Sequence, residues 1–204
     1  MRLKSKFQCQ YCKALAVVHG ASELQIVRYV KSMLHLPLEI YSRGNGGNSI
    51  QINGLMNILN NSSDFNKPKN FLKKYSNIES KKGMPVNFKV FPIMDTDDCA
   101  DDEIREDYID GTLFDGHWMK PYLKSIYNSP SLEDVMLGCE LIERKPSDKE
   151  KTSTYKELFP ITNCNNTNYE EIEELYNRFK GCNKTNFELF IEYCLEWARG
   201  NKIK

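Results

Sequence analysis

The sequence of 204 residues lacks a long apolar run and has no net charge. Its longest apolar run, at residues 14–18, is far shorter than the roughly 20 residues that a bilayer span requires. Because 28 basic residues balance 28 acidic ones, the chain as a whole is neither a basic nucleic-acid-binding tail nor an acidic solvating tail. These absences predict a soluble protein of one compact domain, or of one domain with a helical extension.

The chain also lacks the cysteine pattern of a disulfide-stabilised or zinc-bound protein. Its seven cysteines are odd in number and scattered, which favours reduced thiols. Cys9 and Cys12 have the spacing of half a zinc site, but Cys164, Cys182 and Cys194 are spread too widely to supply the other half. The basic N-terminus does not lead into an apolar stretch, so we expect no secretory signal and a cytoplasmic location.

The first part of the chain alternates segments of strand and helix character. Residues 14–18 predict a buried strand, and apolar residues at three- and four-residue spacing predict a helix at 22–35. A second strand is predicted at 38–41, followed by a glycine-rich loop at 42–48 and another apolar-periodic segment. This order predicts an α/β fold in which helices flank a parallel sheet.

The middle of the chain contains a polar excursion and then the most strongly apolar strand. Residues 60–85 are rich in Asn, Ser and Lys, and predict a surface excursion with a helical turn or two. Within it, Phe71 and Tyr75 are interpreted as tethers to the core, with stacking on nucleic-acid bases as the alternative. The apolar strand is predicted at 88–94.

The remainder of the chain is predominantly helical in pattern. Helices are predicted at 117–125 and 131–141, and the pattern from residue 152 onward is helical. We therefore expect residues 1–145 to form the α/β domain and residues 146–204 to form a helical C-terminal extension packed on it.

Asp95 and Asp97 stand directly at the end of the strand predicted at 88–94. Alternate residues of an extended strand point to the same side, so both carboxylates can bind one hard cation such as Mg²⁺. In open α/β sheets, ligands bind at the carboxyl ends of the strands. Aspartate also favours the turn that ends a strand, so the pair alone does not establish a metal site. Asp98 is expected to point the other way if the strand continues.

His19 and Glu23 follow the first predicted strand. They lie beside Asp95 if the first strand neighbours the strand at 88–94. Each also has a structural interpretation, because Glu23 can stabilise the first turn of a helix through the helix dipole. A single histidine at a strand end is commonly a hydrogen-bonded structural residue.

Charges are distributed unevenly along the chain. Residues 95–115 contain ten acidic residues against Arg105, whereas residues 67–89 contain seven basic residues against Glu79. A metal-dependent nuclease needs carboxylates for its cation and basic residues for the polyanion. The alternative is a set of solvated charged loops. The candidate nucleic-acid ligands are Arg43, Lys73, Lys74, Lys81 and Lys82.

The glycine-rich loop can be interpreted in two ways. Successive backbone N–H groups at residues 43–48 can approach a phosphate, and Ser49 can begin a helix whose N-terminus attracts it. The other interpretation is a flexible connection. The loop lacks the Gly-Lys-Ser/Thr ending of an ATP-binding loop, so any ATP-driven step requires another protein.

These motifs resemble those of the TOPRIM fold, which is found in topoisomerases, primases and OLD-type nucleases. The matching features are an apolar strand followed by a glycine turn and Glu23, and a later apolar strand ending in Asp95-Thr-Asp97. The segment Tyr127-Asn-Ser-Pro-Ser-Leu-Glu133 is similar to the Ser-Asn-Pro-x-Phe-Glu segment of the RloB and AbiLii-type branch of phage-defence proteins, and Tyr155-Lys-Glu-Leu158 suits that branch.

The resemblance implies a metal-dependent nuclease that cleaves DNA or RNA in anti-phage defence by abortive infection. It implies Mg²⁺ or Mn²⁺ held by Glu23, Asp95, Asp97 and Glu133. The catalytic residues that it implies are His19, Glu23, Asp95 and Asp97.

One departure from the family pattern leaves a second function open. His19 stands where TOPRIM enzymes usually place their first glutamate, and imidazole is a poor ligand for Mg²⁺. The alternative is a non-catalytic module that binds nucleic acid or a partner protein, or a subunit that is active only with a separate ATPase. The implied partners are nucleic acid, an ATPase and a second copy in a homodimer, with no membrane partner.

Overall fold

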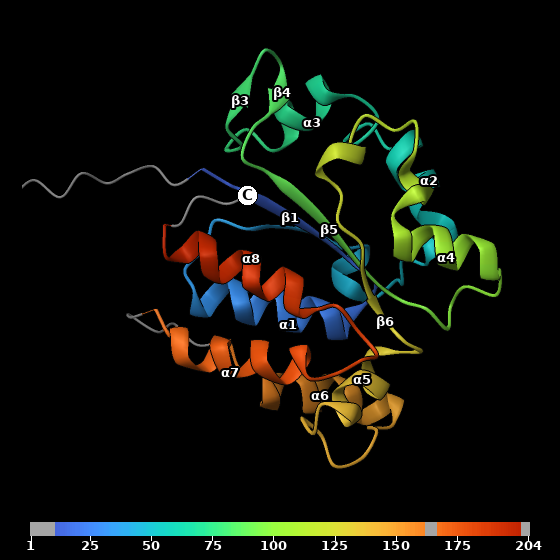
Figure 1. Ribbon diagram of the computed structural model, residues 1–204, viewed down its shortest axis with the longest axis vertical. Coiled ribbons are helices and arrows are strands. Elements are labelled where there is room, and N and C mark those ends of the chain that lie inside the picture. The colour runs from blue at the N-terminus through green and yellow to red at the C-terminus, as the bar shows by residue number, and fades with distance from the viewer. Residues whose placement is uncertain (1–10, 162–166, 201–204) are drawn as a thin grey trace, which may run out of the picture.

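The computed structural model describes residues 11–161 and 167–200, which form a parallel sheet between two layers of helices (Figure 1). The strands are β1 (Ala14–Val18), β2 (Glu39–Tyr41), β5 (Lys89–Asp95) and β6 (Ile126–Asn128). Their order is β2-β1-β5-β6, and each neighbouring pair is parallel. The predicted α/β class with a helix-flanked parallel sheet is therefore confirmed.

Strand β1 is buried on both faces and supplies side chains to two cores. Ala14, Ala16 and Val18 belong to one core, whereas Leu15 and Val17 belong to the other. This division follows from the two-residue period of a strand. A continuous apolar run is therefore what a central parallel strand requires.

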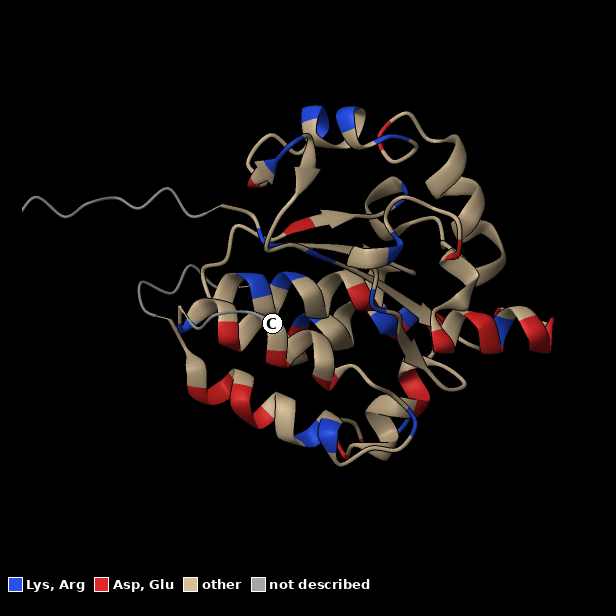
Figure 2. Ribbon diagram, turned by 45° about the horizontal axis from the view of Figure 1, so that its top comes forward, with Lys and Arg blue, Asp and Glu red and all other residues tan. Residues whose placement is uncertain are grey.

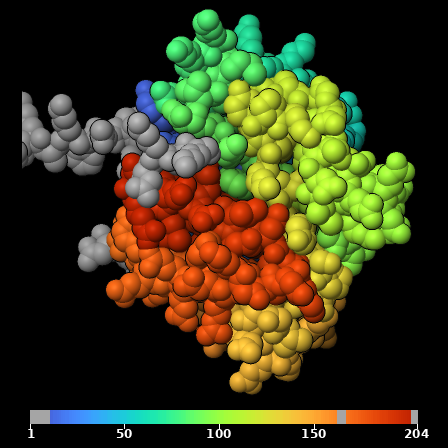
Figure 3. Space-filling model, viewed as in Figure 1, coloured from blue at the N-terminus to red at the C-terminus, as the bar shows by residue number. Residues whose placement is uncertain are grey.

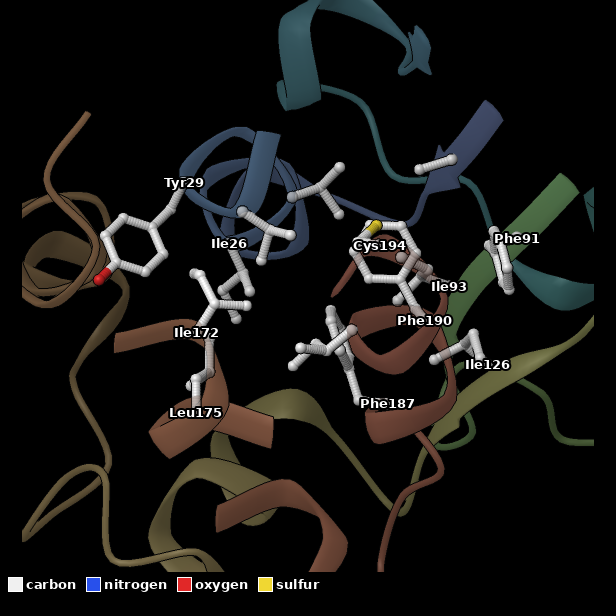
Figure 4. Packing of buried hydrophobic residues seen from close by; sticks show 14 of the residues in the cluster. Ile26, Tyr29, Phe91, Ile93, Ile126, Ile172, Leu175, Phe187, Phe190 and Cys194 are labelled. Atoms are coloured by element: carbon white, nitrogen blue, oxygen red, sulfur yellow. The ribbon is translucent and has the colours of Figure 1, made fainter. Parts of the chain in front are cut away.

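The first core lies between the sheet and five helices. These are α1 (Ala21–Met33), α5 (Leu132–Gly138), α6 (Asp148–Leu158), α7 (Tyr169–Lys180) and α8 (Glu188–Ala198). Figure 4 shows Phe190 and Cys194 of α8 beside Phe91, Ile93 and Ile126 of the sheet, and Ile172 of α7 pointing toward Ile26 of α1. The Phe91 ring packs edge-on against Phe190, with 5.4 Å between ring centroids.

The C-terminal helices cover this face of the sheet. Helices α7 and α8 lie side by side, in orange and red, on one side of the molecule (Figure 3). The Tyr193 hydroxyl donates to the Lys13 carbonyl, 2.7 Å away, at the start of β1. Helix α6 contacts α1, so the C-terminal helical part helps to form the walls of the region around α1.

The second core lies on the opposite face of the sheet. It is covered by α2 (Ile52–Asn61), α3 (Pro68–Lys74) and α4 (Asp102–Asp110). The excursion at 60–85 contains α3 and a short hairpin of β3 (Ser80–Lys81) and β4 (Met84–Pro85). Phe71 is fully buried and contacts Tyr75 and Phe88, which confirms that the aromatic residues tether the excursion.

The helix predicted at 117–125 is wrong. Only a short 3₁₀ turn, Lys120–Tyr122, forms there. The chain then runs beside β5, where the Lys124 amide donates to the Val90 carbonyl over 2.9 Å, and continues into β6. Pairing with a central strand outweighed the local helical pattern. Among the described residues, no helix has the length and apolar character to cross a membrane.

Candidate functional site

A cavity of about 470 Å³ lies at the carboxyl ends of β1 and β5. The strand order reverses between these two strands, because β2 lies on the other side of β1 and β6 lies beyond β5. In doubly wound sheets, such a reversal is where a crevice forms and ligands bind. The cavity is bounded by the first turns of α1 and α5 and by one side of α6.

The structure brings the sequence-predicted carboxylates and histidine together. His19, Glu23, Asp95 and Glu133 all line this cavity. An adjoining hollow of about 610 Å³ shares His19, Asp95 and Glu133, and it is also lined by Asp97. The five residues come from three segments of the chain, and tertiary folding places them at one edge of the sheet.

Asp95 is held in place by its neighbours at the end of β5. Its Oδ1 accepts hydrogen bonds from Asn128 Nδ2, 3.0 Å away, and from the Leu132 amide, 3.1 Å away. These bonds connect the carboxylate to β6 and to the start of α5. Burial, followed by the nearby charge of Glu23, raises the pKa of Asp95 to about 8.

Glu23 combines a structural role with a position in the cavity. Its Oε2 accepts from the Gly20 amide at 2.9 Å, which caps the start of α1 as the structural interpretation predicted. The side chain is only 2% exposed. Burial, with a further contribution from the charge of Glu133, raises its pKa to about 7.

Glu133 lies in the first turn of α5 and contacts α6. Its Oε1 is 3.5 Å from Lys151 Nζ and 3.5 Å from the Tyr155 hydroxyl. Burial disfavours the charged form of Lys151, but the nearby carboxylates of Glu133 and Asp148 outweigh it and raise the pKa of the ammonium group. Burial, together with the charges of Glu133, Glu23 and Asp95, raises the pKa of Tyr155.

His19 is held by both ring nitrogens. Nδ1 donates to the Ile50 carbonyl at 2.9 Å, because a carbonyl oxygen only accepts. Nε2 lies 3.1 Å from Asp98 Oδ2. This arrangement suits an imidazolium paired with the carboxylate. A neutral ring with this tautomer has its free lone pair on Nε2, where it can accept a proton or bind a cation.

The condition under which Asp98 was expected to point away from the site is not met, because the strand ends at Asp95. The amides of Thr96 and Asp97 both donate to the Pro130 carbonyl, over 3.0 Å and 2.9 Å, and these bonds accompany the end of the strand. Asp98 therefore faces His19. Its contact with the site followed from this turn and could not be read from strand alternation.

The donor set is compatible with a hard divalent cation. As the side chains stand, the described residues contain no group of three His, Cys, Asp or Glu side chains placed to hold a metal ion. The hydrogen bonds that Asp95 accepts from Asn128 and Leu132 both use Oδ1. Asp97 is exposed. Carboxylate oxygens are the ligands that Mg²⁺ and Mn²⁺ prefer, so the chemistry of these donors fits such an ion.

Comparison of the chain with protein-family models, with curated proteins and with solved structures gave no significant match.

The predicted nucleic-acid ligands lie away from the carboxylates. Lys73 and Lys74 end α3, and Lys81 and Lys82 belong to the β3–β4 hairpin (Figure 2). Both elements precede β5 at its amino end, whereas Asp95 is its last residue. Seven residues at about 3.3 Å each separate the two ends by roughly 20 Å. The structure does not bring these lysines to the cavity.

Other basic residues, which no sequence motif marked, line the two hollows. They come from α1, from α6 and from the segment before α6: Arg28, Lys145, Lys151 and Lys156. Their positions depend on how α6 packs against α1. Tyr155 belongs to the segment 155–158, which resembles the phage-defence branch. Its position near the carboxylates also results from the packing of α6 against α1.

The glycine-rich loop is packed against the start of α1. Gly46 has φ +84°, and a Cβ atom there would lie 2.8 Å from the Ala21 Cα. Asn45 and Gly46 line the cavity, whereas Arg43 is not among its lining residues. The loop therefore forms one wall of the site.

The candidate zinc half-site cannot be assembled from the described residues. Cys9 and Cys164 lie outside them. Cys12 is buried, and its thiol donates to the Ala14 carbonyl at 3.1 Å. Burial raises the pKa of this thiol to about 11, which favours an unreactive structural cysteine.

Proposed function

We propose that this protein hydrolyses phosphodiester bonds of DNA or RNA with Mg²⁺ or Mn²⁺, using a TOPRIM-like sheet. The observation that supports this most strongly is the convergence of His19, Glu23, Asp95 and Glu133 on one cavity at the strand reversal. These residues come from three separate segments of the chain, and the tertiary fold places them around one cavity.

The carboxylates have distinct roles in the proposed reaction. Asp95, Asp97 and Glu133 would hold the cation, which would supply positive charge to stabilise the phosphate in the transition state and to lower the pKa of a bound water molecule. Glu23 is a further ligand or accepts the proton of the attacking water. His19 transfers a proton through Nε2 during the reaction, while the hydrogen bond from Nδ1 to the Ile50 carbonyl fixes the ring.

The wider setting of the proposal comes from the family resemblance. The 127–133 segment supports a role in abortive infection in the cytoplasm. An ATPase partner would supply any nucleotide-driven step, because the chain contains no ATP-binding Gly-Lys-Ser/Thr loop. A homodimer is part of the same expectation.

A second candidate is a non-catalytic module that binds nucleic acid or a partner protein. It is favoured by the contacts of His19, whose two ring nitrogens are engaged by Ile50 and Asp98. If this pairing is permanent, His19 is a structural residue rather than a proton carrier or a metal ligand.

The test is cleavage by the purified chain. Labelled single- and double-stranded DNA and RNA are incubated with Mg²⁺, with Mn²⁺ or with EDTA. We expect cleavage that requires the cation and falls by at least about 100-fold in Asp95→Asn, because the substitution removes a charged ligand. Asp110→Asn, at the exposed end of α4, is the matched control and should cleave normally.

Two outcomes would contradict the nuclease proposal. Cleavage that survives Asp95→Asn would show that the activity does not use this site. Binding of nucleic acid without cleavage under any of these metal conditions would favour the non-catalytic module.

A further inference from the structure

The cavity is lined by basic side chains as well as by the buried carboxylates. Arg28 on α1 and Lys156 on α6 both line it and both are exposed. Among the described residues, neither forms an ion pair with a carboxylate. Two unneutralised cations therefore border the same space as Glu23, Asp95 and Glu133.

Lys151, in contrast, pairs with carboxylates. Its Nζ is 3.5 Å from Glu133 Oε1 and 3.7 Å from Asp148 Oδ1. It therefore offsets the carboxylates, whereas Arg28 and Lys156 remain available to an anion that enters. A cavity lined by both carboxylates and basic side chains suits a ligand that carries phosphate and is bound together with a metal ion.

Arg28 and Lys156 are carried by two helices, α1 and α6, that pack against each other. Gln25 Nε2 donates to the Phe159 carbonyl at 2.7 Å, which ties α1 to the end of α6. The Phe159 ring also packs against Tyr29 and Tyr155, with centroid distances of 5.5 Å and 6.2 Å. The backbone positions that carry Arg28 and Lys156 are thus held before any ligand arrives.

The size and depth of the cavity limit what can reach the carboxylates. Its volume of about 470 Å³ falls in the range of about 300–1,000 Å³ that is typical of small-molecule sites. Glu23, Asp95 and Glu133 are 2%, 7% and 8% exposed, so a reacting phosphate must enter the cavity. Enzymes that must bring a base into an enclosed pocket act on single strands or extrude the nucleotide from the duplex. By the same steric reasoning, the backbone of a flexible single strand enters a cavity of this size more readily than that of a rigid duplex.

We propose that the cavity between α1 and α6 binds the phosphate of an unpaired nucleotide adjacent to the bond that is cut, with Arg28 and Lys156 as its ligands. The substrate class is therefore single-stranded nucleic acid. This inference rests on the proposed function and makes it more specific. It also assigns phosphate binding to α1 and α6 rather than to Lys81 and Lys82 at the other end of β5.

The test is equilibrium binding, measured apart from cleavage. Fluorescence anisotropy with short single-stranded DNA and RNA in EDTA gives the dissociation constant at several salt concentrations. In Arg28→Gln/Lys156→Gln we expect affinity to fall by at least about tenfold and the salt slope to decrease by about 1.4, for two lost phosphate contacts. Lys81→Gln/Lys82→Gln removes the same charge and should bind like the wild type.

Two further measurements complete the test. A fully paired duplex of the same sequence should bind more weakly than the single strand, and a free mononucleotide should compete only at much higher concentration than a strand. Thermal unfolding of each variant verifies that it is folded. Equal losses in the two double variants, duplex binding as tight as that of the single strand, or a mononucleotide as effective as the strand would overturn the inference.

The binding and cleavage results separate the two proposals. A wild-type protein that binds single strands through Arg28 and Lys156 but does not cleave them contradicts only the proposed hydrolysis. A protein that cleaves with a metal ion, yet binds equally well in Arg28→Gln/Lys156→Gln, contradicts only this inference.

Discussion

Without divalent cations, the stability of this protein should fall as the pH rises. Burial raises the pKa of Glu23 to about 7 and that of Asp95 to about 8; the charge of Glu133 adds to the first shift and the charge of Glu23 adds to the second. In the unfolded chain both groups have pKa values near 4. The folded protein therefore holds more protons than the unfolded chain between about pH 4 and pH 8, and its stability decreases across this window.

The expected size of the effect follows from the number of retained protons. One proton retained by the folded state changes the free energy of unfolding by about 1.4 kcal/mol per pH unit. For a domain of this size, 1 kcal/mol corresponds to about 2–4 °C in Tm. Between about pH 5.5 and pH 7, Glu23 and Asp95 together retain roughly 1.5 to 2 protons, so the Tm of the wild type should fall by roughly 4–11 °C per pH unit.

Asp95→Asn isolates the contribution of the aspartate. An asparagine Oδ1 can accept the bonds that Asn128 Nδ2 and the Leu132 amide now donate, so the substitution removes the charge with little loss of contacts. Between about pH 7 and pH 8, where Asp95 still titrates, the wild-type Tm should continue to fall and the variant Tm should level off.

Thermal unfolding followed by circular dichroism in EDTA measures these slopes. Asp110→Asn, in which an exposed carboxylate is replaced, should keep the wild-type pH dependence. A wild-type Tm that is constant from about pH 5.5 to pH 8, or an Asp95→Asn slope parallel to that of the wild type above pH 7, would refute the reasoning.

Two other predictions concern the metal ion and the glycine-rich loop. At about pH 8, Mg²⁺ or Mn²⁺ at 100 times its Kd should stabilise the wild type by about 2.7 kcal/mol, seen as a higher Tm, and should stabilise Asp95→Asn much less. An equal rise in Tm in both proteins would place the ion elsewhere. Gly46→Ala should destabilise the fold by at least about 1 kcal/mol, because Gly46 has positive φ and a Cβ would meet the Ala21 Cα at 2.8 Å. Gly83→Ala, with positive φ but open space, is the control and should cost less in urea unfolding.

The sequence alone was sufficient for the features that depend on local periodicity. The apolar run of β1 reflects burial on both faces of the sheet, and the run of β5 leads directly to Asp95. Because parallel strands end at a common edge, residues that follow two apolar strands could be expected to meet. His19, Glu23, Asp95 and Asp97 were predicted for this reason.

Only the tertiary structure decided the features that depend on contacts between distant segments. Asp98 joins the site because the Pro130 carbonyl, from beyond β6, accepts the Thr96 and Asp97 amides as the strand ends. β6 forms because its residues pair with β5, although the local pattern favoured a helix before it. Arg28, Lys151 and Lys156 line the same cavity as the carboxylates because α6 packs on α1, and no local pattern carries information about that packing.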